Sequence, residues 1–219
     1  MSMLNVETIP VTEFGQNSRI LWCSDTKEGV VLDPGGEAER ILATAKRLGV
    51  SISAVWLTHS HLDHCGGVAP LLQTLRVPLL AHPEERMMRS NVKSIAQMYG
   101  MSPVEWHNCP EPTIPIKGGE TLSIGNSTCI VLFTPGHSPG HVSFYFERDQ
   151  LLASGDVLFA GSIGRTDLPG GDTKTLLDVI RREIFSLPPQ TRVLAGHGPD
   201  TTVGEEKASN PFFNGVEYD

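Results

Sequence analysis

Residues 58 to 64 read Thr-His-Ser-His-Leu-Asp-His and directly follow the apolar run 54–57, Ala-Val-Trp-Leu. Such a run, ending at a polar cluster, is typical of a short buried strand that empties into a loop. A single loop histidine is more often solvated than functional. Three imidazoles and one carboxylate within six residues reverse that preference and indicate a metal site.

The spacing of these four side chains indicates what kind of site they form. His59, His61, Asp63 and His64 follow an i, i+2, i+4, i+5 pattern, and a helix would spread them apart. Alternate residues of an extended segment share one face. We therefore expect His59 and His61 to reach one ion, while the turn that follows carries Asp63 and His64 toward another.

Three further ligand-type residues stand in loops after apolar runs. His137 follows the run 130–133, Asp156 follows 151–153, and His197 follows 193–195. Glycine or proline flanks each of them, and these residues let the backbone bend so that a ligand points into a shared cleft. Together with the first cluster they predict a site with more than one metal.

These four segments, in this order, resemble the metallo-β-lactamase superfamily. Within it the chain is similar to short bacterial members of the glyoxalase II (hydroxyacylglutathione hydrolase) group, on the residues 31–36, 164–167 and 210–212. The resemblance implies an α/β fold, a four-layer αββα sandwich of two mixed sheets flanked by helices. It also implies the metal ligands: His59, His61 and His137 for one ion, Asp63, His64 and His197 for the second, and Asp156 as the bridge.

A site of this kind hydrolyses its substrate with water. Two divalent ions share a hydroxide and stabilise the oxygens of attack and departure, so Asp63 and Asp156 are the expected catalytic carboxylates. No Gly-x-Ser-x-Gly motif for a serine nucleophile is present. Mixed histidine and aspartate ligation accommodates zinc, iron or manganese, and zinc is our expectation.

The glyoxalase II resemblance implies a thioester substrate of the S-lactoylglutathione type. A thiolate leaves with little general-acid help, which suits a site built around a hydroxide. Longer members carry a C-terminal helical region with basic residues for glutathione, whereas this chain ends at Asp219, so the thiol carrier stays open. Arg165 could hold a substrate carboxylate through its guanidinium fork.

Two other functions remain open. A related branch oxygenates persulfides with one iron, which His59, His137 and Asp156 could hold as two histidines and a carboxylate. Metal stoichiometry and oxygen uptake would distinguish that activity from hydrolysis. A non-catalytic metal-stabilised scaffold is the third possibility, and the presence of all seven ligand-type residues argues against it.

Composition bounds the remaining choices. No linker or repeat divides the 219 residues, so we expect one domain over 1–219, and no apolar run is long enough to span a membrane. Four scattered cysteines and the lack of a basic-then-apolar leader favour reduced thiols in the cytoplasm. With a net charge of −8 and no basic stripe, nucleic acid is disfavoured as a partner, and a small molecule is expected. Nothing indicates the oligomeric state.

The local patterns predict most elements. We expect strands over 6–11, 20–23, 30–32, 54–57, 78–81, 121–124, 128–133, 142–146, 151–153 and 193–195, and helices over 37–48, 67–72, 83–99 and 172–185. Gly125-Asn126 is a hairpin turn signal, and Asp172 or Thr173 is a helix cap. On the helix over 83–99, Met87, Met88, Ile95 and Met98 form a stripe that could face substrate, although such a stripe more often fills the core. Asp33 is expected to brace the ligand loop, and His141 is left outside the metal set.

Overall fold

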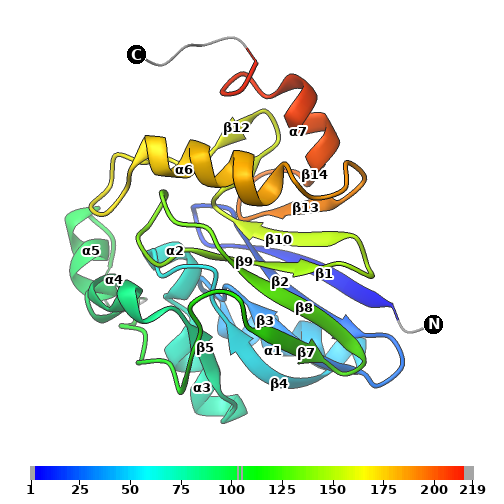
Figure 1. The fold of residues 1–219 in the computed structure, drawn as a ribbon. Coiled ribbons are helices and arrows are strands. Elements are labelled where there is room, and N and C mark those ends of the chain that lie inside the picture. The colour runs from blue at the N-terminus through cyan, green and yellow to red at the C-terminus, as the bar shows by residue number, and fades with distance from the viewer. Residues whose placement is uncertain (1–2, 103, 105, 215–219) are drawn as a thin grey trace.

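The computed structural model describes residues 3–102, 104 and 106–214, and its main strands form two mixed six-stranded sheets (Figure 1). The first sheet contains, in spatial order, β1 (Leu4–Val11), β2 (Gln16–Cys23), β3 (Glu28–Leu32), β4 (Ser51–Trp56), β5 (Leu79–Ala81) and β6 (Ile114–Pro115). The second contains β14 (Thr201–Thr202), β13 (Arg192–Ala195), β10 (Leu151–Gly155), β9 (Val142–Phe146), β8 (Ser127–Phe133) and β7 (Thr121–Ile124). Pairing is antiparallel from β1 to β3 and parallel from β3 to β6, whereas in the second sheet β10 and β13 are the parallel pair.

Strand alternation separates the interior into layers. Leu21 and Val30 point into the core between the two sheets, while their neighbours Ile20 and Val31 point to the opposite face of the first sheet. Across the inner core the Trp56 ring of the first sheet packs on the Phe144 ring of the second, with 4.9 Å between ring centroids. The two sheets therefore form a sandwich with a shared apolar core.

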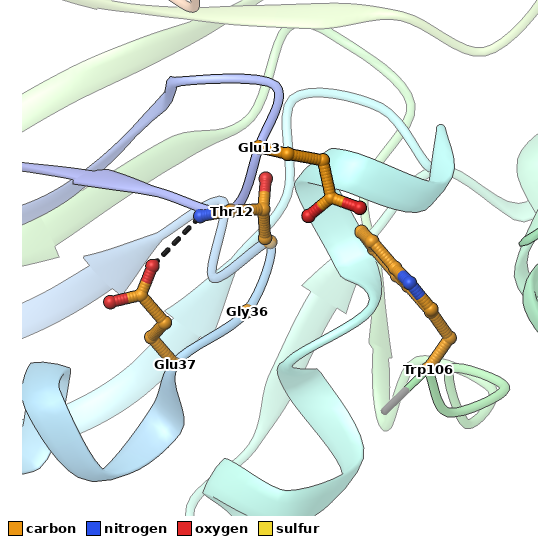
Figure 2. A pocket seen from close by; sticks show the side chains of 6 residues that line it. Thr12, Glu13, Gly36, Glu37 and Trp106 are labelled. Atoms are coloured by element: carbon orange, nitrogen blue, oxygen red, sulfur yellow. Dashed lines mark hydrogen bonds between the residues drawn. The ribbon is translucent and has the colours of Figure 1, made fainter. Parts of the chain in front are cut away.

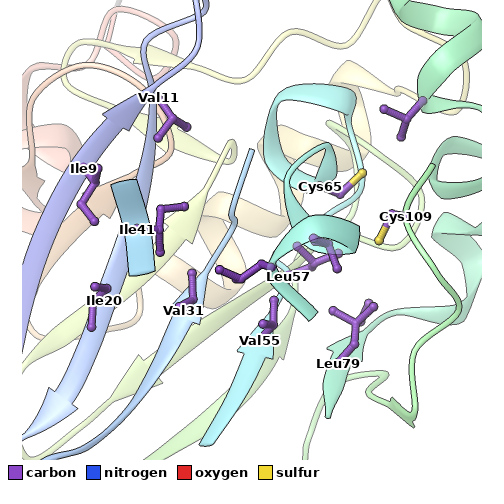
Figure 3. Packing of buried hydrophobic residues seen from close by; sticks show 14 of the residues in the cluster. Ile9, Val11, Ile20, Val31, Ile41, Val55, Leu57, Cys65, Leu79 and Cys109 are labelled. Carbon is purple, nitrogen blue, oxygen red and sulfur yellow. The ribbon is translucent and has the colours of Figure 1, made fainter. Parts of the chain in front are cut away.

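Helices cover both outer faces of this sandwich. The helices α1 (Ala38–Leu48), α3 (Val68–Leu75) and α5 (Val92–Met98) pack on the first sheet, and Figure 3 shows Ile41 of α1 beside Ile20 and Val31. The helix α6 (Thr173–Val179), the π-helical turn η2 (Ile180–Ile184) and α7 (Val203–Ser209) cover the second sheet. The prediction of a four-layer αββα fold is confirmed.

The prediction of one long helix over 83–99 is wrong. The chain forms a 3₁₀ turn η1 (Pro83–Glu85), then α4 (Arg86–Ser90), and then α5. The break lies at Asn91, which leaves the helical region and donates its side-chain amide to the Met87 carbonyl at 2.7 Å. An asparagine side chain that bonds the local backbone competes with helix continuation in this way.

The stripe of Met87, Met88, Ile95 and Met98 on this segment fills the core only in part, because Ile95 packs against it. Met87 is 74% exposed and Met98 is 86% exposed, so these two side chains lie in solvent. Several short elements went unpredicted: β6, β14, α7, and the hairpin of β11 (Leu158–Phe159) with β12 (Ser162–Ile163). In the described part of the chain, no helix combines the length and apolar character needed to cross a membrane.

Two local turn predictions are confirmed. Gly125 has a φ of 54° in the tight turn that joins antiparallel β7 and β8. Asp172 caps α6 by accepting the backbone N–H of Thr175 at 2.6 Å. The second of these fixes the start of α6.

Candidate metal centre

Four loops at the ends of strands bring together all seven residues predicted as metal ligands. The segment after β4 supplies His59, His61 and, on the short helix α2 (Leu62–Cys65), Asp63 and His64. The other loops follow β8, β10 and β13, and they supply His137, Asp156 and His197 in turn. The ligand atoms form three overlapping groups, and within each group they lie within 4.8 Å of one another.

The first group consists of three imidazoles. His59 Nε2 lies 3.1 Å from His61 Nδ1 and 3.2 Å from His137 Nε2. Two of these histidines come from the loop after β4 and the third from the loop after β8. The grouping is the one expected for the first ion.

A second group lies beside the first and contains Asp63, His64 and His197. The His197 Nε2 atom is 3.1 Å from Asp63 Oδ2 and 3.4 Å from His64 Nε2. Between the two groups stands Asp156, whose Oδ1 is 3.3 Å from His64 Nε2 and whose Oδ2 is 3.6 Å from His137 Nε2. Asp156 is thus placed where a carboxylate could contact two ions.

The backbone around the first cluster is only partly extended. His61 has extended dihedral angles, φ −61° and ψ 154°, as expected, but it is the N-cap of α2. Asp63 and His64 lie on that single helical turn, and not on an extended segment. Adjacent residues on a helix point in different directions, yet here the change of direction at His61 brings both side chains to the second group.

The donor set fits divalent cations. The imidazole nitrogens of the first group that face one another at 3.1 and 3.2 Å do not all carry hydrogens, so lone pairs converge there. Burial lowers the pKa of His59 and of His137 and lowers that of His61 to about 3, which keeps all three imidazoles neutral and able to ligate. Among the residues that the structure describes, the buried His61 Nε2 atom has no hydrogen-bond partner. Neutral imidazoles with carboxylates are the ligand chemistry of zinc, iron and manganese sites.

In the second group the pKa values of the histidines are raised, whereas those of the first group are lowered. Burial alone would lower the pKa of His64, yet the carboxylates of Asp156 and Asp63 raise it well above its usual value. For His197 burial is likewise outweighed, by Asp63 and Asp156, and its pKa is raised. Burial would raise the pKa of Asp156, but nearby His64 holds it far below its usual range. Without metal, the histidines of the second group therefore bind protons more strongly than those of the first group.

Hydrogen bonds from outside the seven side chains fix several of them. Asp33, which is buried at φ 48°, accepts the Thr58 backbone N–H and hydroxyl, both at 2.7 Å, and its Oδ2 lies 3.0 Å from His64 Nδ1. The expectation that Asp33 braces the ligand loop is confirmed. His141, which is not part of the three groups, accepts the Asp156 backbone N–H on Nε2 at 3.1 Å. These bonds orient the ligands toward one another.

Some supporting residues gave no signal in the sequence. Arg19 of β2 is 2% exposed, donates to the Ala195 carbonyl at 2.7 Å and pairs with Asp200 at 2.7 Å. It therefore holds the start of the loop that carries His197. Gly196 leaves no room for a side chain, because a Cβ there would lie 2.0 Å from Asp156 Oδ1. In the sequence, the glycine beside His197 indicates this close approach, whereas no pattern indicates that Arg19 supports the site.

Arg165 is not one of the clustered side chains. Its guanidinium is exposed and forms a two-point ion pair with Asp167, at 2.7 Å for each bond. Its backbone carbonyl accepts a hydrogen bond from His137 Nδ1 at 2.7 Å. The residue therefore lies at the edge of the site and orients His137 through its main chain.

A hollow of about 420 Å³ lies against the segment that carries Asp63. Its lining residues are Thr12, Glu13, Gly35, Gly36, Glu37 and Trp106. Gly35 packs against the backbone carbonyl of Asp63 so closely that a Cβ would overlap it. In Figure 2 the carboxylate of Glu13 points toward the Trp106 indole, while Glu37 is engaged with the Thr12 backbone N–H at 2.8 Å. The hollow is thus acidic with one aromatic wall.

Comparisons with known proteins agree with this geometry. The family model described as "Metallo-beta-lactamase superfamily" matches residues 11–197. A Haemophilus influenzae protein named hydroxyacylglutathione hydrolase GloC is 38% identical over 218 residues, covering 96% of this chain and 99% of the relative. The solved structure of BLEG-1 B3 metallo-beta-lactamase is similar at 40% identity with a TM-score of 0.88, covering 96% of this chain and 100% of that chain.

A second solved structure, that of TTHA1623 in a di-iron-bound form, has 38% identity and a TM-score of 0.84, covering 94% of this chain and 99% of that chain. The family model spans the ligand segments from His59 to His197. With the fold, the His/Asp cluster and these likenesses in agreement, the chain belongs to the metallo-β-lactamase superfamily, a superfamily of metal-dependent hydrolases.

Proposed function

We propose that this protein hydrolyses a thioester, with S-lactoylglutathione or a related hydroxyacyl thioester as the substrate. The observation that carries the proposal is the convergence of seven ligand-type side chains on one strand-end site. The likeness to a relative named hydroxyacylglutathione hydrolase supports the choice of thioester, because the two chains match over nearly their whole lengths. Free thiols at Cys65, Cys109 and Cys129 accord with a cytoplasmic setting, which is part of the proposal.

The proposed ligand sets follow the groups described above. His59, His61 and His137 would hold one divalent ion, Asp63, His64 and His197 would hold the other, and Asp156 lies where it could serve both. Bound there, two divalent ions would supply an activated hydroxide and a Lewis acid for the substrate carbonyl. Zinc is the proposed metal, and the di-iron form of a similar structure makes iron the first alternative.

The remaining residues determine what reaches this site. His59, His64 and Asp156 are buried, whereas His61, Asp63 and His197 are partly exposed, so substrate approaches from the side of the latter three. A thiolate leaving group needs little proton donation, and the proposal therefore assigns no general acid. Asp33 and the Arg165 carbonyl keep His64 and His137 directed at the reacting centre.

The proposal assigns recognition of the thiol carrier to two places, Arg165 and the hollow beside Asp63. Arg165 is the proposed contact for a carboxylate of the substrate, and it must exchange its partner Asp167 for that carboxylate. The hollow beside Asp63 has the opposite preference, because the carboxylate of Glu13 in its lining repels an anionic group. A carrier with both an ammonium and a carboxylate group suits this arrangement.

The test is thiol release from S-D-lactoylglutathione by the purified protein. Parallel assays use the matching oxygen ester, a β-lactam, and glutathione persulfide with measured oxygen uptake. The proposal expects rapid release from the thioester and much slower turnover of the ester and the β-lactam. Oxygen consumption with the persulfide, together with no thioester hydrolysis, would replace the proposal with sulfur oxygenation by one iron. Preferential β-lactam hydrolysis would replace it with the activity in the name of the similar BLEG-1 structure.

A further inference from the structure

One buried carboxylate outside the seven candidate ligands connects two of the ligand loops. Glu85, the last residue of η1, is 0% exposed. Its Oε2 accepts the backbone N–H of Ser60 at 2.9 Å, and its Oε1 accepts the backbone N–H of Gly140 at 2.7 Å. A single planar group thereby joins the loop after β4 to the loop after β8.

The two backbone amides that Glu85 accepts from lie close in sequence to candidate metal ligands. Ser60 lies between His59 and His61, and Gly140 lies three residues after His137. The three histidines form the first group, although they come from two loops whose strands belong to different sheets. Since both loops bond the same carboxylate, its position determines how far apart these imidazoles stand.

The surroundings of Glu85 are closely fitted. A Cβ on Gly140 would lie 2.9 Å from Glu85 Cγ and 2.6 Å from His82 Nδ1, so only glycine allows this approach. The His82 ring accepts the Glu84 backbone N–H at 3.2 Å and stacks on Phe133 of β8, with 5.2 Å between centroids. These contacts hold η1, and with it the carboxylate, against the loop that carries His137.

The charge of Glu85 has no cationic side chain as partner within the part of the chain that the structure describes. Its carboxylate bonds to two main-chain N–H groups, each of which belongs to a ligand loop. A buried carboxylate is costly unless it is well hydrogen-bonded, and such charge-assisted bonds to backbone N–H groups are short and strong. A neutral glutamine could not accept from both amides at once, because one of its two arms is a donor.

We propose that Glu85 is a positioning residue that sets the spacing of the three-histidine group before any metal binds. If one of the two acceptor oxygens of Glu85 is removed, the His59–His61 loop and the His137 loop can move apart. The metal affinity that is then lost belongs to the position formed by these three histidines. The inference rests on the proposed metal role of these histidines and deepens it. It makes no use of the identity of the substrate.

The variant Glu85→Gln tests this with metal binding as the readout. The matched control is Glu206→Gln, which alters a carboxylate that is 3% exposed and accepts from Gly161, Thr201 and Asn210, outside the ligand loops. Both are titrated with zinc against a chromophoric chelator, and their cobalt forms are compared by visible absorption.

Glu85→Gln is expected to weaken one of the two metal positions by about 10- to 100-fold and to change the cobalt spectrum. Glu206→Gln is expected to keep wild-type metal affinity at both positions, even if its Tm falls as far as that of Glu85→Gln. Wild-type affinity at both positions in folded Glu85→Gln protein overturns the inference, and so does an equal loss of affinity in the control.

A second measurement needs no variant. In the metal-free wild-type protein, the Ser60 and Gly140 amides are expected to exchange with solvent as slowly as amides in the central strands. Rapid exchange of either amide overturns the inference even if Glu85→Gln fails to fold. Absence of thioester hydrolysis by the wild-type protein would refute the proposed function while leaving both of these readouts intact.

Discussion

Asp33→Asn is the substitution that separates ligand orientation from backbone strain most cleanly. Asp33 has a φ of 48°, and asparagine tolerates this left-handed region about as well as aspartate. The wild-type carboxylate accepts the Thr58 N–H and hydroxyl and lies 3.0 Å from His64 Nδ1. Asparagine retains one acceptor oxygen for the Thr58 N–H, but its amide nitrogen faces the Thr58 hydroxyl and His64.

The expected magnitude follows from the lost orientation of His64. Without its acceptor the imidazole can take either tautomer and rotate, and the loss of such a supporting partner costs about 10- to 100-fold in metal affinity. That loss corresponds to about 1.4 to 2.7 kcal/mol of binding free energy. The fold should persist, because the Thr58 main-chain bond remains and no side-chain volume is lost.

The assay is a competition titration of zinc against a chelator of known affinity, at a pH near 7.5, on the purified metal-free protein. Asp172→Asn serves as the control, because aspartate and asparagine cap a helix equally well and the substitution leaves the main-chain bond from the Asp172 N–H to the Gly136 carbonyl in place. If folded Asp33→Asn protein binds both ions with wild-type affinity, His64 does not depend on Asp33 and the reasoning is refuted.

Four further outcomes are expected. Asp156→Ala should lose metal and most turnover while remaining folded, as measured by metal analysis and circular dichroism, and full activity with intact metal would contradict its bridging place between the two groups. The pKa values of His64 and His197 are raised in the metal-free protein, so the second ion must displace protons from them. The apparent affinity for that ion should therefore increase as the pH rises, and protons should be released during the metal titration. A metal affinity that does not change between pH 5.5 and 8 would be inconsistent with this. Arg165→Met should raise KM for a carboxylate-bearing thioester with little change in kcat, and an unchanged KM would remove Arg165 from the substrate contacts. Burial raises the pKa of Cys129 to about 12, so iodoacetamide at pH 8 should label that thiol only after unfolding, as mass spectrometry of the native protein would show.

The candidate ligands that cluster in the structure could be picked out from the sequence because the signal for each is local. His137, Asp156 and His197 each end a short apolar run, and the strands β8, β10 and β13 stand where those runs were recognised. The order of the segments then indicated the family and, through it, the four-layer fold. The Asp172 helix cap was predicted for the same reason, because its hydrogen bond joins residues only three positions apart in the sequence.

The supporting contacts were not predictable because they join distant parts of the chain. Glu85 bonds Ser60 and Gly140, 25 and 55 residues away, and Arg19 bonds the Ala195 carbonyl across 176 residues. No local pattern distinguishes a buried glutamate of this kind from a solvated one on a helix. The break at Asn91 was missed because helical periodicity continues on both sides of it, and a single side chain that bonds the preceding carbonyl decides the outcome.

The most direct test of the central claim combines turnover and metal content on one sample. Purified protein is assayed for hydrolysis of S-D-lactoylglutathione, its metals are counted, and an aliquot is chelated and then reloaded. We expect about two divalent ions per chain, loss of thiol release on chelation, and its return on reloading. Turnover that survives complete chelation, or a protein that holds two ions and releases no thiol, would contradict the assignment of a binuclear thioester hydrolase.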